Sequence, residues 1–76
     1  NNMKKKIIYK RIGMSRTSGN TWLTDEYDVI EENEKGYKAI LNYTNNPLSE
    51  LKRGEVYEIT RHKIAWNYEM KVIEVN

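Results

Sequence analysis

The side chains of this 76-residue chain that could do chemistry are one histidine, a run of carboxylates and a run of basic residues. His62 is the only imidazole, and no Gly-x-Ser-x-Gly elbow places a nucleophile beside it. The carboxylates within residues 24–34 lack the spacing of a calcium loop. A glycosidase would need two of them across a cleft, and so small a chain offers little cleft. We therefore expect no catalytic residue, no metal site and no cofactor.

The composition narrows the class of protein further. Charged residues make up 32% and hydrophobic residues 38% of the chain, and the net charge is +2, which describes a folded domain of high solubility. The chain has no cysteine, which excludes disulfide scaffolds and suits a reducing cytoplasm. No apolar run approaches the ~20 residues of a membrane span. The bias towards Lys, Asn, Ile and Tyr is typical of AT-rich coding, as in phages and mobile elements.

Positive charge is concentrated near the N-terminus. Residues 4–16 contain six basic side chains and no acidic one, and a second basic pair lies in a later turn. Small barrels that bind single-stranded nucleic acid combine a basic groove with aromatic side chains on which bases stack. The sequence thus predicts a nucleic-acid-binding module whose candidate residues are Lys4, Lys5, Lys6, Lys10, Arg11, Arg16, Lys52 and Arg53, with Trp22 or Tyr9 as the stacking aromatic.

Negative charge follows directly, because residues 24–34 contain six acidic side chains and no basic one. On neighbouring strands the two runs would face each other and contribute ~0.2–1 kcal/mol per pair. The alternative function is a protein-interaction or inhibitory module that uses this acidic strand, or an open barrel edge, against another protein. Its candidate residues are Asp25, Glu26, Asp28, Glu31 and Glu32. The sequence leaves open whether the basic run pairs or stays free, and whether the chain is a monomer or a dimer.

Alternation of apolar and polar residues with period two is the main structural signal. The stretch Ser15–Thr21 is small and polar and predicts a loop, and a turn at residues 34–36 predicts a hairpin. Two apolar doublets, Val29-Ile30 and Val72-Ile73, interrupt the alternation and predict either a β-bulge or a strand that passes from one sheet to another. The expected strands are residues 5–12, 24–32, 37–44, 56–60 and 64–72.

Asn46, Pro47 and Gly54 predict a short helical turn over residues 47–53. Five short strands favour a small antiparallel all-β barrel, because closure removes sticky sheet edges. We expect one domain over residues 3–76, with the first two residues left over from cloning because Met3 is suited to be the native start. The predicted core is Ile8, Ile12, Leu23, Val29, Leu41, Leu51, Val56, Ile59, Ile64, Trp66, Met70 and Val72.

Residues 39–44 (Ala-Ile-Leu-Asn-Tyr-Thr) and 48–59 (Leu-Ser-Glu-Leu-Lys-Arg-Gly-Glu-Val-Tyr-Glu-Ile) resemble the Src homology three pattern. That family has an Ala-Leu-Tyr-Asp-Tyr motif, then Leu-Ser-Phe, then a Lys-x-Gly-Asp/Glu turn that opens a strand. The resemblance implies an Src homology three-like barrel. It does not imply binding of proline-rich peptides, because only Tyr43 matches an aromatic of the first motif.

Overall fold

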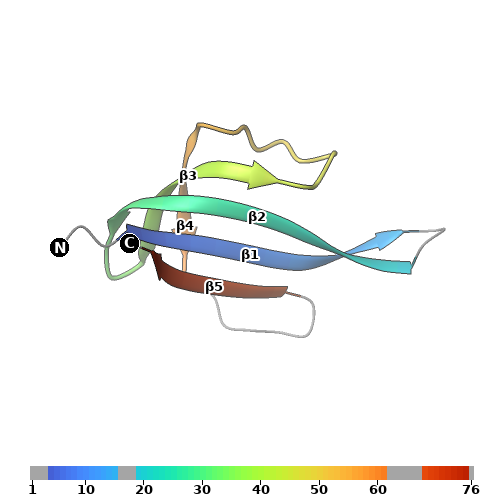
Figure 1. Ribbon diagram of the computed structural model, residues 1–76, viewed down its shortest axis with the longest axis horizontal. Coiled ribbons are helices and arrows are strands. Elements are labelled where there is room, and N and C mark those ends of the chain that lie inside the picture. The colour runs from blue at the N-terminus through green and yellow to red at the C-terminus, as the bar shows by residue number, and fades with distance from the viewer. Residues whose placement is uncertain (1–3, 16–18, 62–67, 76) are drawn as a thin grey trace.

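Five antiparallel strands form one curled sheet in the computed structural model, which describes residues 4–15, 19–61 and 68–75. The spatial order of the strands is β4-β3-β2-β1-β5 (Figure 1). The all-β, five-stranded antiparallel prediction is confirmed. In chain order the strands are β1 (Lys4–Ser15), β2 (Gly19–Glu32), β3 (Gly36–Thr44), β4 (Val56–Thr60) and β5 (Tyr68–Val75).

The strands β1 and β2 form a long hairpin whose register runs from Lys6 opposite Asp28 to Ser15 opposite Gly19. The strand predicted over residues 5–12 is therefore confirmed and is longer than predicted. The loop prediction for residues 15–21 is wrong at both ends, because the described part of this stretch continues the backbone ladder. A ladder needs only N–H and C=O groups, so small polar side chains do not interrupt it.

The predicted hairpin between β2 and β3 is confirmed. Its turn is held by Asn33, whose Oδ1 accepts hydrogen bonds from the N–H groups of Lys35 (2.9 Å) and Gly36 (3.0 Å). The register shifts between Val29 and Glu31, so Ile30 is an extra residue and the bulge predicted there is confirmed. Such a bulge increases the twist of a strand, which contributes to the strong curl of the sheet.

The bulge predicted at Val72-Ile73 is wrong. The strands β1 and β5 pair without a shift from Arg11 opposite Tyr68 to Lys4 opposite Val75. An apolar doublet in a regular strand sends one side chain to each face. Both faces accept one here, because β5 is at the edge of the sheet and Val72 retains 38% of its exposure.

The hydrophobic core lies on one face of the curled sheet, which we call the inner face and which carries Ile7, Tyr27, Tyr37, Ala39 and Leu41. Because side chains alternate along a strand, the even-numbered side chains of β1 lie on the opposite face, which we call the outer face. The predicted core is therefore correct for Leu41 and wrong for β1 and for the start of β4. Four further predicted members pack against the buried residues: Val29, Leu51, Ile59 and Met70. Ile8 and Ile12 lie on the outer face, Val56 is 50% exposed, and Ile64 and Trp66 lie outside the described residues.

The helical turn predicted over residues 47–53 is wrong. Asn46 opens a β-turn instead, because its Oδ1 accepts the N–H of Leu48 (3.0 Å) and its carbonyl accepts the N–H of Ser49 (3.1 Å). The Oγ of Ser49 then accepts the N–H of Leu51 (3.1 Å), a group that a helix would bond to a backbone carbonyl. Side-chain oxygens thus compete successfully with helical hydrogen bonds in this segment.

The sheet is open in the described part of the chain, because β4 and β5 are its two edges and do not pair with each other. Figure 1 shows β4 running across the direction of β1 and β2, as expected of a strongly curled sheet. No helix long enough to cross a membrane occurs among the described residues.

Candidate interaction surfaces

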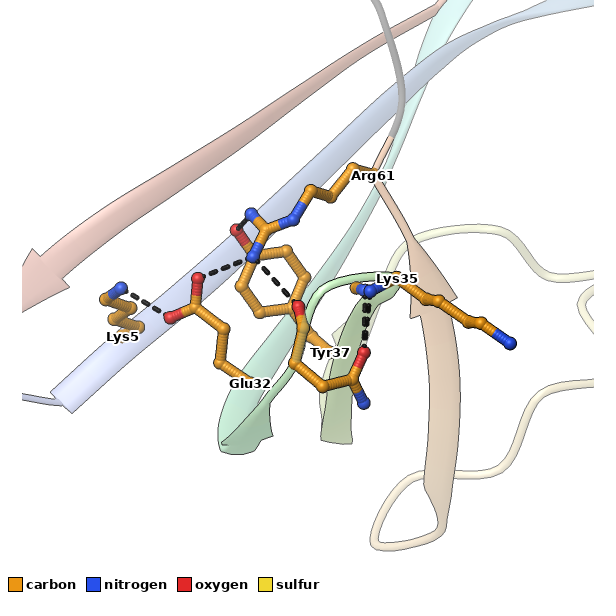
Figure 2. A network of polar contacts seen from close by, with 7 residues as sticks. Lys5, Glu32, Lys35, Tyr37 and Arg61 are labelled. Atoms are coloured by element: carbon orange, nitrogen blue, oxygen red, sulfur yellow. Dashed lines mark hydrogen bonds and ion pairs between the residues drawn. The ribbon is translucent and has the colours of Figure 1, made fainter.

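A cluster of charged and polar side chains connects strands β1, β2 and β3 with the end of β4 (Figure 2). Glu32, at the end of β2, accepts hydrogen bonds from Nζ of Lys5 (2.6 Å) and Nη2 of Arg61 (2.7 Å). The Arg61 guanidinium also lies 4.6 Å from the ring centroid of Tyr37 and donates to its hydroxyl and to the carbonyl of Asn33 (3.1 Å). We call Lys5, Glu32, Tyr37 and Arg61 the clasp, since they connect β1, β2 and β3 with the residue that follows β4.

The charges of the clasp stabilise one another. The hydrogen bonds from Arg61 and then from Lys5 hold the pKa of Glu32 below its usual value. The hydrogen bond to Glu32 in turn raises the pKa of Lys5 and that of Arg61. The clasp therefore uses one predicted nucleic-acid residue, Lys5, and one predicted protein-interaction residue, Glu32, for structure.

Two further ion pairs connect neighbouring strands on the surface. Nζ of Lys6 lies 3.9 Å from Oδ1 of Asp28, and Nζ of Lys38 lies 3.6 Å from Oε2 of Glu31. All four side chains are at least one third exposed, so each pair contributes little to stability but favours the observed register. Cross-strand pairing thus occurs for Lys5 and Lys6, which the sequence left open.

The remaining predicted basic residues do not form one patch. Lys4 and Lys10 lie on the outer face and Arg11 on the inner face, and none of the three forms an ion pair within the described residues. Lys52 and Arg53 are exposed in the turn before β4, and Arg16 lies outside the described residues. The basic run of the sequence is therefore divided between two faces.

One basic residue is close to the predicted stacking aromatic. Trp22 is 48% exposed and lies opposite Ile12 in the ladder, while Lys10 lies opposite Thr24. Both Trp22 and Lys10 are on the outer face, as diagonal neighbours. Trp22 is therefore accessible, as a stacking role would require.

The predicted acidic surface is also divided, because β2 is a central strand and its carboxylates alternate between faces. Glu26 and Asp28 are on the outer face, whereas Asp25 is half-buried on the inner face. Asp25 lies in the wall of a groove of about 500 Å³ with Arg11 and Tyr27, and its Oδ1 is buried without a hydrogen-bond partner among the described residues. Burial raises the pKa of Tyr27 to about 12, and the negative charge of Asp25 adds to the shift. No group of three potential metal ligands occurs in the described ranges.

The two sheet edges are the surfaces that sequence reasoning did not locate. β4 is an edge of five residues and β5 an edge of eight, and β5 pairs only with β1 among the described strands. The sequence signal for β5 is the charged residues Glu69, Lys71 and Glu74 within an otherwise apolar strand, a pattern typical of edges. Comparison of the chain with protein-family models, curated protein sequences and solved structures finds no significant match.

Proposed function

We propose that this chain is a non-catalytic protein-interaction module that binds its partner by strand addition at the β5 edge. The observation that carries the proposal is the open sheet, in which β5 pairs with β1 on one side and with no described strand on the other. In an antiparallel ladder every second residue directs its N–H and C=O away from its neighbour. The outer side of β5 thus offers a row of hydrogen-bonding groups to an added strand.

The edge β5 suits this role better than β4. It is eight residues long against five, so it offers more backbone groups to an added strand. The charges of Glu69 and Lys71 discourage unspecific pairing and favour a strand with opposite charges at matching positions. Backbone hydrogen bonds provide affinity in this mode, while these side chains provide specificity.

Hydrogen exchange of the β5 amides at low protein concentration tests whether this edge is open. We expect alternation along residues 68–75, with slow exchange where the N–H bonds to β1 and fast exchange at the positions between. Slow exchange at every β5 amide of the monomer would mean that the edge is covered, and the proposal would be wrong.

A synthetic peptide then tests strand addition itself. The peptide alternates valine and threonine and places a lysine opposite Glu69 and a glutamate opposite Lys71. We expect it to slow exchange at the outward amides of β5 while the β1-directed amides keep their rates. The matched control has the lysine and glutamate exchanged, so that like charges meet, and should bind more weakly. If the two peptides protect β5 equally, or neither does, recognition does not follow the edge charges.

Nucleic acid is the second candidate partner, and the neighbouring Lys10 and Trp22 on the outer face favour it. An exposed aromatic beside a cation is the arrangement on which unpaired bases stack. In a titration with single-stranded oligothymidine at low salt, the amides around Lys10 should shift, and Trp22→Ala and Lys10→Gln should each weaken binding. Lys38→Gln, which removes a cation paired with Glu31, is the matched control. Unmoved amides at low salt would exclude this candidate.

The finer predictions from the sequence remain proposals. These are closure of the curled sheet into an Src homology three-like barrel, an origin in a phage or mobile element, and a cytoplasmic location. The proposed function is compatible with a phage origin and with a cytoplasmic location, whereas closure into a barrel would cover the β5 edge and exclude strand addition there.

A further inference from the structure

We infer that the β5 edge pairs with the β5 edge of a second copy of this chain, antiparallel, about a two-fold axis at Met70. This inference rests on the proposed strand addition at β5 and names the partner. The charges of the edge strand carry it, because they are self-complementary in one register only.

The geometry of a continuous sheet limits the possible registers. When two identical antiparallel edges join, the two-fold axis is perpendicular to the sheet, and the inner faces of both copies lie on the same side. Residues opposite each other then project to the same face, so β5 residues at even positions oppose even ones and odd oppose odd. An axis within the eight residues of β5 therefore lies midway between one residue and the same residue of the second copy, and we name each axis by that residue.

Charge selects among these registers. Axes at Glu69, Lys71 or Glu74 place a charged residue opposite its own copy, and axes at Val72 or Ile73 leave every charge opposite an apolar residue or outside the described strand. The axis at Met70 places Glu69 opposite Lys71 of the partner subunit and Lys71 opposite Glu69 of the partner subunit. Of the six axes through residues 69–74, this one alone joins opposite charges, and it does so twice.

The neighbouring residues fit the same register. The axis places Tyr68 opposite Val72 of the partner subunit on the inner face, where the 38% exposed Val72 side chain would be covered. Met70, which already packs against the core, would meet its own copy beside Tyr9. On the outer face, Lys10 of β1 lies opposite Glu69 of β5. In the joined sheet, positive and negative charges would therefore alternate from Lys10 to Glu69 to the partner's Lys71.

Charge reversal tests the register, because each variant has a defined expected result. Sedimentation equilibrium over a roughly hundredfold concentration range should show reversible dimerisation of the unmodified chain. Glu69→Lys or Lys71→Glu alone converts both attractive pairs to repulsive ones, and we expect each to weaken the dimer at least about tenfold. The double variant Glu69→Lys/Lys71→Glu exchanges the two charges, restores both pairs and should dimerise like the unmodified chain.

Two controls separate this effect from folding and from net charge. Circular dichroism and thermal unfolding establish that each variant is folded, since Glu69 also lies opposite Lys10. Lys52→Glu changes the net charge as Lys71→Glu does, but in the exposed turn before β4, and should leave the dimer intact.

The inference is overturned if the unmodified chain stays monomeric over the whole range, if either single variant dimerises like it, or if the folded double variant does not recover. The exchange pattern of the β5 amides distinguishes this failure from failure of the proposed function. A monomer whose outward β5 amides exchange rapidly still has an open edge for another protein. A monomer whose β5 amides are all protected has no such edge.

Discussion

Substituting alanine for Gly36 should detach part of β4, because an added Cβ would overlap the backbone of β4. A Cβ at Gly36 would lie 2.0 Å from the carbonyl oxygen of Ile59 and 2.9 Å from the Cα of Thr60, both backbone atoms of β4. An ordinary carbon–oxygen contact is about 3.3 Å, so β4 would have to retreat by roughly 1.3 Å. Backbone hydrogen bonds near 2.9 Å do not survive such a shift.

The expected loss of stability follows from the pairing that this shift disrupts. Gly36 lies opposite Thr60 and Tyr37 opposite Ile59, at one end of a five-residue ladder. Losing two or three hydrogen bonds at about 1 kcal/mol each, with some burial of Ile59, gives about 3 kcal/mol. A domain of this size has only about 4–11 kcal/mol in total, at ~0.05–0.15 kcal/mol per residue. Gly36→Ala should therefore be severely destabilising but not necessarily unfolding.

Gly54 is the matched control, because its backbone conformation favours glycine while the space around it would accept a Cβ. Its φ is +88°, while a Cβ there would meet no atom within 4 Å. Gly54→Ala should cost about 1–2 kcal/mol through backbone conformation alone. Urea unfolding followed by circular dichroism measures both losses, and hydrogen exchange locates them. The reasoning is refuted if Gly36→Ala costs no more than Gly54→Ala, or if it leaves exchange of the β4 amides unchanged.

The pH dependence and the core yield three further predictions. The raised pKa of Tyr27, about 12 against 10.0 unfolded, means that its stabilisation is complete below pH 10 and is lost as the pH rises towards 12. The loss of stability with rising pH should therefore be smaller in Tyr27→Phe, as measured by urea midpoints from pH 9.5 to about 12. The lowered pKa of Glu32 implies stabilisation that is present above its unfolded pKa and lost as the pH falls through the folded value. Arg61→Gln should move the Glu32 pKa up towards its usual value in a carboxyl NMR titration, and an unchanged pKa would show that Arg61 is not the main cause. Leu41 is fully buried, so Leu41→Ala should cost about 2–5 kcal/mol in urea unfolding, and a loss below 1 kcal/mol would contradict its place in the core.

Local signals in the sequence predicted the parts of the fold that local chemistry determines. The Asn33 side chain and Gly36 form the hairpin turn within four residues. An apolar doublet alone does not determine a bulge, because Val29-Ile30 has one and Val72-Ile73 has none. The face of β1 could not be predicted in this way, because Ile7 and Ile8 are adjacent and either can begin an apolar face. Pairing with Tyr27 on β2 decides the choice in favour of Ile7.

The rest of the candidate site depends on contacts between residues that are far apart in sequence. Arg61 and Glu32 are separated by 29 residues and meet because the pairing of β3 with both β2 and β4 places them on either side of Tyr37. Tyr43 illustrates the same limit on a smaller scale. The alternation in β3 predicted it beside Leu41, but the register shift between Glu26 and Tyr27 places it opposite Glu26, where it is 42% exposed. No pattern within β3 alone reports that shift.

The topology explains how the two strongly charged runs come to lie side by side. β1 lies between β2 and β5, and three of its basic residues, Lys5, Lys6 and Lys10, have a carboxylate on at least one neighbouring strand. Lys5 bonds to Glu32 on β2 and lies opposite Glu74 on β5, while Lys10 lies opposite Glu69. A central basic strand flanked by acids exerts a weaker long-range attraction on phosphates than the basic run would alone. Short-range recognition is favoured instead, because the order of charges along β5 persists where the net charge has cancelled, and the order of charges is what an added strand meets.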